Sequence, residues 1–192
     1  LKMRIKFGYI LICLFLGTQG MRASHIIGGK ITYKSLGANK YEITLTVYRD
    51  CGVTLGFDNP AFISIYNKSN NSLVYSAGLF LLSRDTVKAS SSNPCFVPPP
   101  GICIETGIYK DTVLLLPNSS GYTIAYQRCC RNFSVLNITV PNMTGTTITA
   151  DIPPTANNTP LFINDPPMFI CYSDTFKYSF AATDLDNDSL VY

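Results

Sequence analysis

The chain has 192 residues, of which 46% are hydrophobic and 14% charged, and its formal net charge is +3 at pH 7. This length suits one domain, or one domain with part of a second, and the hydrophobic content is enough to build a core, which excludes wholesale disorder. Four of the 15 basic residues precede Ser24, namely Lys2, Arg4, Lys6 and Arg22. Without them 11 basic residues face 12 acidic ones, which excludes a nucleic-acid partner on grounds of charge.

The first 23 residues are typical of a signal peptide. A basic start is followed by the apolar run Phe7–Gly17 and then by small residues between positions 18 and 24. The run is too short to cross a bilayer and has the length of a signal-peptide core, although an uncleaved anchor is the alternative. We expect residues 1–23 to be removed on export, which leaves an extracellular or outer-surface product without a membrane span.

The cysteine content agrees with export. One of the seven cysteines, Cys13, lies in the apolar run. The six that remain are Cys51, Cys95, Cys103, Cys129, Cys130 and Cys171. An even number in an exported chain indicates disulfides, although the sequence leaves fifteen pairings open. Zinc is the rival explanation, but His25 is the single histidine and no CxxC pair occurs, so the sequence favours disulfides.

Local features suggest some of the pairings. Cys95 and Cys103 flank a proline-rich loop, where a bridge would stabilise a segment with few ladder hydrogen bonds of its own. Cys129 and Cys130 follow a predicted strand, and neighbours on a strand face opposite sides, so we expect them to bond different partners. One of these two could meet Cys51, which follows an earlier strand.

The rest of the chain is typical of β-structure. In the segment 41–48 the apolar residues Tyr41, Ile43, Leu45 and Val47 alternate with polar ones, as in a strand with one buried face. Similar short runs occur at 30–34, 61–66, 73–76, 109–116, 122–127, 135–140, 146–152 and 176–180. Many short strands separated by turn residues predict an all-β fold, a β-sandwich of the immunoglobulin-like or jelly-roll-like kind.

The composition changes at 153–167, where Pro-Pro, Asn-Asn and Asn-Asp-Pro-Pro are typical of an inter-domain linker. We therefore predict a disulfide-containing β-sandwich domain over 24–163. Residues 164–192 would begin a second, immunoglobulin- or cadherin-like β-domain. A few strands cannot bury a sheet face by themselves, so we expect that second domain to be incomplete at Tyr192.

An acidic turn is the most specific chemical feature of the sequence. Asp184, Asp186 and Asp188 stand at alternating positions, and carboxylate oxygens are the ligands that calcium prefers. Asn164 and Asp165 supply further oxygen ligands at the domain boundary. The sequence therefore predicts calcium as a cofactor bound by these five residues, and the alternative is a solvated turn capped by its own hydrogen bonds.

Catalytic residue patterns are scarce. The single histidine lies near the N-terminus, so no Ser-His-Asp or Cys-His nucleophile is indicated, and Glu42 and Glu105 are the only glutamates. We expect a protein that is not an enzyme.

Four stretches of the exported part are distinctive, namely 24–33 (SHIIGGKITY), 41–51 (YEITLTVYRDC), 126–132 (YQRCCRN) and 182–192 (ATDLDNDSLVY). Together they resemble the N-terminal region of large secreted surface proteins of gliding-type Bacteroidota. Such proteins often carry PKD-like or other immunoglobulin-like repeats and end in a gliding-motility-associated sorting domain for type IX secretion. The last stretch also resembles cadherin-like domains, in which such aspartates bind calcium. The family often has a cysteine near 156–158 that this chain lacks, which leaves Cys171 without an assigned partner.

The resemblance implies a location outside the cell and a role in adhesion or cell-surface structure. The leading hypothesis is a non-enzymatic extracellular surface module of a large multi-domain exported protein, whose partner is an unknown surface ligand, either glycan or protein. The alternative is a carbohydrate-binding module attached to an enzyme or adhesin encoded further along the chain.

Overall fold

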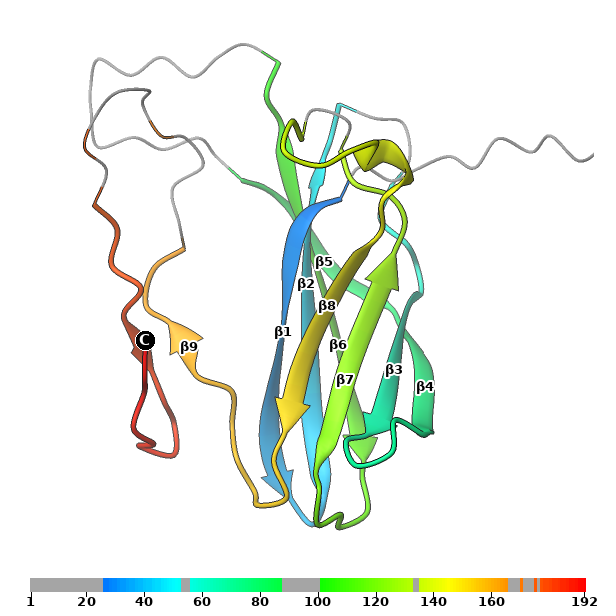
Figure 1. Ribbon diagram of the computed structural model, residues 1–192, viewed down its shortest axis with the longest axis vertical. Coiled ribbons are helices and arrows are strands. Elements are labelled where there is room, and N and C mark those ends of the chain that lie inside the picture. Colours follow the sequence, from blue (N-terminus) through cyan, green and yellow to red (C-terminus); the bar gives the residue numbers. More distant parts are fainter. Residues whose placement is uncertain are drawn as a thin grey trace, which may run out of the picture.

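The computed structural model describes residues 26–52, 56–87, 101–132, 135–165, 170, 175 and 177–192. In these ranges it is built from strands and one short 3-10 helix, η1 (Figure 1). The elements are β1 (Ile26–Gly37), β2 (Lys40–Asp50), β3 (Ala61–Asn67), β4 (Leu73–Leu79), β5 (Leu81–Val87), β6 (Ile104–Leu114), β7 (Tyr122–Arg128), η1 (Pro141–Met143), β8 (Thr146–Ile152), β9 (Leu161–Phe162) and β10 (Ala182–Thr183).

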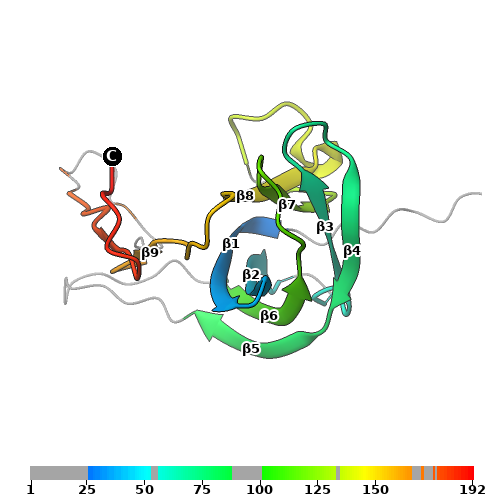
Figure 2. The ribbon, with the colours of Figure 1, turned by 90° about the horizontal axis from the view of Figure 1, so that it is seen from below.

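Eight of the strands form two antiparallel sheets that pack face to face. The strand orders are β1-β2-β6-β5 and β4-β3-β7-β8. Figure 2, which looks along the strands, shows the two sheets curving around a common interior. The predicted all-β sandwich is therefore confirmed. The short ladder of β9 and β10 lies outside the sandwich, beside β1 (Figure 1).

The core lies between the sheets and is built from alternate strand residues. Ile43 and Leu45 of β2 meet Ile63 and Ile65 of β3 and Ile124 of β7, and all five side chains are fully buried. The alternation predicted for 41–48 is thus the one observed. Burial of these side chains supplies the main stabilising free energy of the fold.

Three local features differ from the predictions. Residues 135–140 form turns and bends rather than a strand, the described part of the expected strand 176–180, residues 177–180, is not in a strand either, and β5 was not predicted. β5 pairs only with β6 among the described strands, at the edge of its sheet, and most of its residues are exposed. An edge strand needs no regular alternation of apolar and polar residues, so its sequence carries a weak strand signal.

The adjacent glycines Gly28 and Gly29 of β1 lie in different environments. A Cβ at Gly28 would meet nothing within 4 Å, whereas a Cβ at Gly29 would lie 2.5 Å from the carbonyl oxygen of Thr46 and 2.6 Å from Cδ1 of Ile148. Ile148 belongs to β8 in the opposite sheet. The missing side chain at Gly29 is therefore what lets β8 approach β1 where the sheets meet.

We expect Gly29→Ala to lower the free energy of unfolding by about 1–3 kcal/mol, because the new methyl group would push β8 away from β1. Gly28→Ala, one residue earlier, is the matched control and should change it by less than about 0.5 kcal/mol. Urea unfolding followed by circular dichroism measures both. Equal effects of the two substitutions would contradict the described packing.

Candidate functional site

Two disulfides lie at the end of the sandwich where β2 and β7 finish and β6 begins (Figure 1). Cys51 is bonded to Cys103, and Cys129 is bonded to the adjacent Cys130 across a cis peptide bond. The structure therefore places these four cysteines in disulfides, as the sequence predicted.

The pairing of Cys103 corrects the prediction. It bonds Cys51 and not Cys95, because β2 and β6 are antiparallel neighbours and the residue after β2 lies beside the residue before β6. The two Cα atoms are 5.3 Å apart, which suits a disulfide. The backbone amide of Cys51 also donates to the carbonyl of Cys103 at 3.1 Å. Cys95 and Cys171 lie outside the described residues.

The prediction that Cys129 and Cys130 bond different partners, with Cys51 as one of them, is wrong. It assumed that both cysteines continue the strand and so face opposite sides of the sheet. β7 ends at Arg128, one residue before the pair, so the alternation of a strand does not apply to them.

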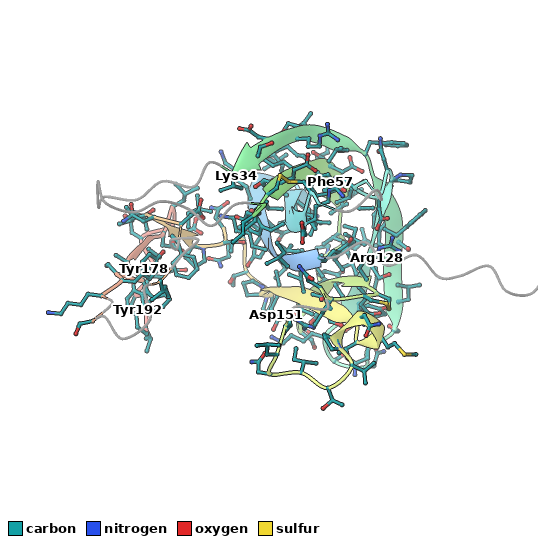
Figure 3. The ribbon with its side chains drawn as sticks, turned by 90° about the horizontal axis from the view of Figure 1, so that it is seen from above. Lys34, Phe57, Arg128, Asp151, Tyr178 and Tyr192 are labelled. Atoms are coloured by element: carbon teal, nitrogen blue, oxygen red, sulfur yellow. A yellow bond between two sulfur atoms is a disulfide. The ribbon has the colours of Figure 1, made fainter. Side chains whose placement is uncertain are left out.

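A buried ion pair lies between the sheets at this same end. Nη2 of Arg49 is 2.6 Å from Oε2 of Glu105, and the side chains of these two residues are 7% and 12% exposed. The guanidinium group of Arg49 also lies over the ring of Phe57, 5.0 Å from its centroid. That ring fills the space that a side chain at Gly107 would take. Figure 3 looks down on this end, with Phe57 labelled.

A second polar group lies next to the ion pair. Arg128 is 2.8 Å from the carboxylate of Asp58, Tyr109 donates to the carbonyl of Asp58 at 2.8 Å, and Tyr126 donates to its carboxylate at 3.4 Å. Burial, together with the negative charge of Asp58, raises the pKa of both tyrosines above the ordinary value. Arg49 is thus paired with Glu105 and Arg128 with Asp58, so these contacts between opposite charges hold the fold together at this end.

We expect the two buried tyrosines to make the protein sensitive to alkali. A pKa that folding raises means that the folded state favours the neutral phenol. The stability that the two tyrosines contribute is therefore fully present below the pKa of tyrosine in the unfolded chain, about 10, and is lost as the pH rises above it towards the folded-state pKa. The absorbance of tyrosinate and circular dichroism, recorded together during an alkaline titration, should show Tyr109 and Tyr126 ionising only as the sandwich unfolds. Their ionisation in the intact fold, assigned through Tyr109→Phe and Tyr126→Phe, would contradict this.

The predicted calcium ligands fall into two groups. Carboxylate oxygens of Asp184, Asp186 and Asp188 all lie within 4.8 Å of one another. That group does not include Asp165, whose carboxylate is 3.2 Å from the amine of Lys30. The backbone carbonyl of Asn164 accepts a hydrogen bond from the hydroxyl of Tyr178 at 2.5 Å. The structure thus brings the three aspartates together in one turn, and their binding of calcium stays a prediction.

The turn is also held by hydrogen bonds of its own. One oxygen of Asp184 accepts the backbone amides of Asp186 at 2.8 Å and Asp188 at 3.3 Å. The carboxylate of Asp186 accepts two further hydrogen bonds from Asn158, one from its backbone amide at 2.6 Å and one from its side chain at 2.8 Å. These contacts fit the alternative of an acidic turn capped by hydrogen bonds, and they connect the turn to the linker.

The linker is attached to the edge of the sandwich along β1. The backbone amide of Tyr33 donates to the hydroxyl of Thr159 at 2.8 Å, and the amide of Thr159 donates to the carbonyl of Tyr33 at 3.0 Å. The side-chain oxygen of Asn158 accepts the amide of Ser35 at 2.8 Å. Asn158 therefore binds the sandwich through its oxygen and the acidic turn through its nitrogen. We call the contacts of residues 158–159 with β1 and with Asp186 the linker clamp.

We expect Asn158→Ala to loosen the acidic turn while leaving the sandwich intact, because the change removes side-chain bonds to both Ser35 and Asp186. Backbone amide order parameters of residues 182–188 should fall, and those of β1–β8 should stay unchanged. Asn157→Ala is the matched control, since its side chain contacts the hydroxyl of Tyr33 at 3.5 Å and not the acidic turn. Order parameters that do not differ between the two variants would show that the clamp does not hold the turn.

Sequence reasoning did not find the linker clamp or the buried ion pair. Asn158 and Thr159 belong to a polar linker, and hydrogen bonding to a strand leaves no periodic pattern in such a segment. Glu105 was noticed only as one of two glutamates. Arg49 stands two residues after Val47, at the next inward-facing position of β2. Its position in the strand does not identify the residue with which it pairs.

Comparison with protein families, curated proteins and solved structures found no match to this chain. Among the described residues there is no helix long and apolar enough to cross a membrane.

Proposed function

We propose that this chain is a non-enzymatic extracellular module of a large multi-domain exported protein, with an adhesin-like or structural role at the outer surface. The signal-peptide pattern and the resemblance to surface proteins of gliding-type Bacteroidota support the location. The observation that carries the proposal is the linker clamp, because it ties the chain leaving the sandwich both to β1 and to the turn that follows.

The clamp suits a module in a row of domains. A polar linker without contacts would let successive domains rotate freely. Here Asn158 and Thr159 hold the linker against β1, and the exposed Lys30–Asp165 ion pair is a further contact between β1 and the linker. A surface protein that carries load or presents a distant domain needs such a restrained connection.

Display at the surface can be tested on the producing cells. Antibodies raised against the folded chain should label intact cells, and a brief protease treatment of intact cells should remove the label while a cytoplasmic protein survives. Labelling that requires permeabilised cells would overturn the proposal.

A carbohydrate-binding module is the second candidate function. The observation that favours it is an uncharged hollow at the end of the sandwich opposite the disulfides, where the linker begins. Binding of a glycan there would be compatible with an adhesin-like role.

A further inference from the structure

A hollow of about 160 Å³ lies where the β1–β2 turn, the β6–β7 loop and the start of the linker meet. Its lining residues come from 35–41, 115–122 and 153–156, and we call it the basal pocket. It lies at the opposite end of the sandwich from the disulfides, at the bottom of Figure 1.

The walls of the basal pocket are held in place by the protein's own hydrogen bonds. The hydroxyl of Tyr122 donates to the carbonyl of Leu116 at 2.6 Å, and the amide of Leu115 donates to the carbonyl of Asn39 at 2.9 Å. The side chain of Asn118 donates to the carbonyl of Gly121 and accepts the amide of Ser120, so both of its polar atoms are used. The pocket is therefore preformed, and a ligand would have little to rearrange.

The chemistry of the lining selects the kind of ligand. No Lys, Arg, His, Asp or Glu lines the pocket, so a charged ligand would lose its hydration without gaining a counter-charge. Tyr41, Pro117, Pro153 and Pro154 contribute apolar surface. An uncharged ligand with both apolar and polar sides fits these walls.

Three polar side chains of the lining, those of Ser35, Asn39 and Tyr41, make no hydrogen bond within the residues that the structure describes, in contrast to those of Asn118 and Tyr122. They come from the end of β1, the β1–β2 turn and the start of β2. A ligand that carries several hydroxyl groups could satisfy all three at once.

The volume of the pocket suits one ring-sized unit of a ligand. A cavity of about 150 Å³ in another protein holds benzene, so this hollow of about 160 Å³ can seat one ring, and because it opens to solvent the rest of the ligand can extend out of it. We propose that the basal pocket binds one uncharged sugar ring, the terminal unit of a neutral glycan. This inference rests on the carbohydrate-binding alternative given above and names the site and ligand class for it.

The test uses the full, oxidised chain and a panel of four neutral sugars, namely glucose, galactose, mannose and N-acetylglucosamine. Amide proton–nitrogen correlation spectra recorded during titration should show saturable shifts from at least one sugar, confined to residues 35–41, 115–122 and 153–156. Ala156→Trp, which places a large ring at the pocket, should weaken binding by about tenfold or more. Thr155→Trp is the matched control, because Thr155 is exposed and does not line the pocket, and it should bind as the parent does.

A gentler pair of variants keeps the test independent of folding. Tyr41→Phe removes one hydroxyl from the pocket and should weaken binding by about fivefold, while Tyr48→Phe, on the other face of the same strand, should not. No saturable shift with any of the sugars would overturn the site, as would equal binding by Ala156→Trp and Thr155→Trp. Shifts confined to another face would also overturn it. None of these results would change the labelling of intact cells, so failure of the sugar site and failure of the proposed function are distinguishable.

Discussion

Replacing both cysteines of the Cys51–Cys103 bridge by alanine should lower the free energy of unfolding by about 4 kcal/mol. The bridge joins residues 52 positions apart, so its loss restores to the unfolded chain the freedom of a long loop. Guanidinium unfolding of the oxidised parent and of the double variant measures the difference. Because a domain of this size is typically stable by only about 5–15 kcal/mol, this loss would remove between about a quarter and about four-fifths of its stability.

The second disulfide supplies the control. Cys129 and Cys130 are adjacent, so their bridge closes almost no loop and its removal frees little of the unfolded chain. Cys129→Ala/Cys130→Ala should therefore cost much less than the first double variant. Equal losses from the two would show that the Cys51–Cys103 bridge does not act through loop closure.

Glu105→Ala should lower the free energy of unfolding by about 3 kcal/mol or more. Glu105 is the carboxylate partner of Arg49, whose side chain is almost fully buried between the sheets. Removing one partner of a buried ion pair takes away the opposite charge that offsets the lost hydration of the other, and this costs more than the pair contributes when intact. Thermal and chemical unfolding both report the loss.

Glu42→Ala is the matched control for that change. Glu42 lies on the neighbouring strand β2 and forms an ion pair with Lys110 at 3.0 Å, but both side chains are partly exposed, so its loss should cost less than about 1 kcal/mol. Similar effects at the two glutamates would contradict the burial of Glu105. Salt should weaken the Glu42 pair and leave the Glu105 pair nearly unchanged.

Several features could be predicted from the sequence because they depend on residues close together in the chain. The alternation at 41–48 predicted a strand with one buried face, and Ile43, Leu45 and Val47 are buried as expected. Short apolar runs between turn residues predicted the sandwich, and the even number of cysteines predicted disulfides. The three aspartates were recognised as one acidic turn because they are two positions apart.

Other features needed the tertiary structure, because they depend on which distant segments become neighbours. The register of β2 against β6 decides that Cys51 meets Cys103 and that Arg49 meets Glu105, and alternation along one strand says nothing about register. Because β7 ends at Arg128, Cys129 and Cys130 lie outside the strand and bond each other. Asn158 lies in a polar linker, and the basal pocket is lined by turns and by the start of that linker. The contacts of these segments depend on how the two sheets pack. The local pattern thus determined most of the strands and the buried face of β2, and packing decided the disulfide partners, the buried ion pair, the linker clamp and the pocket.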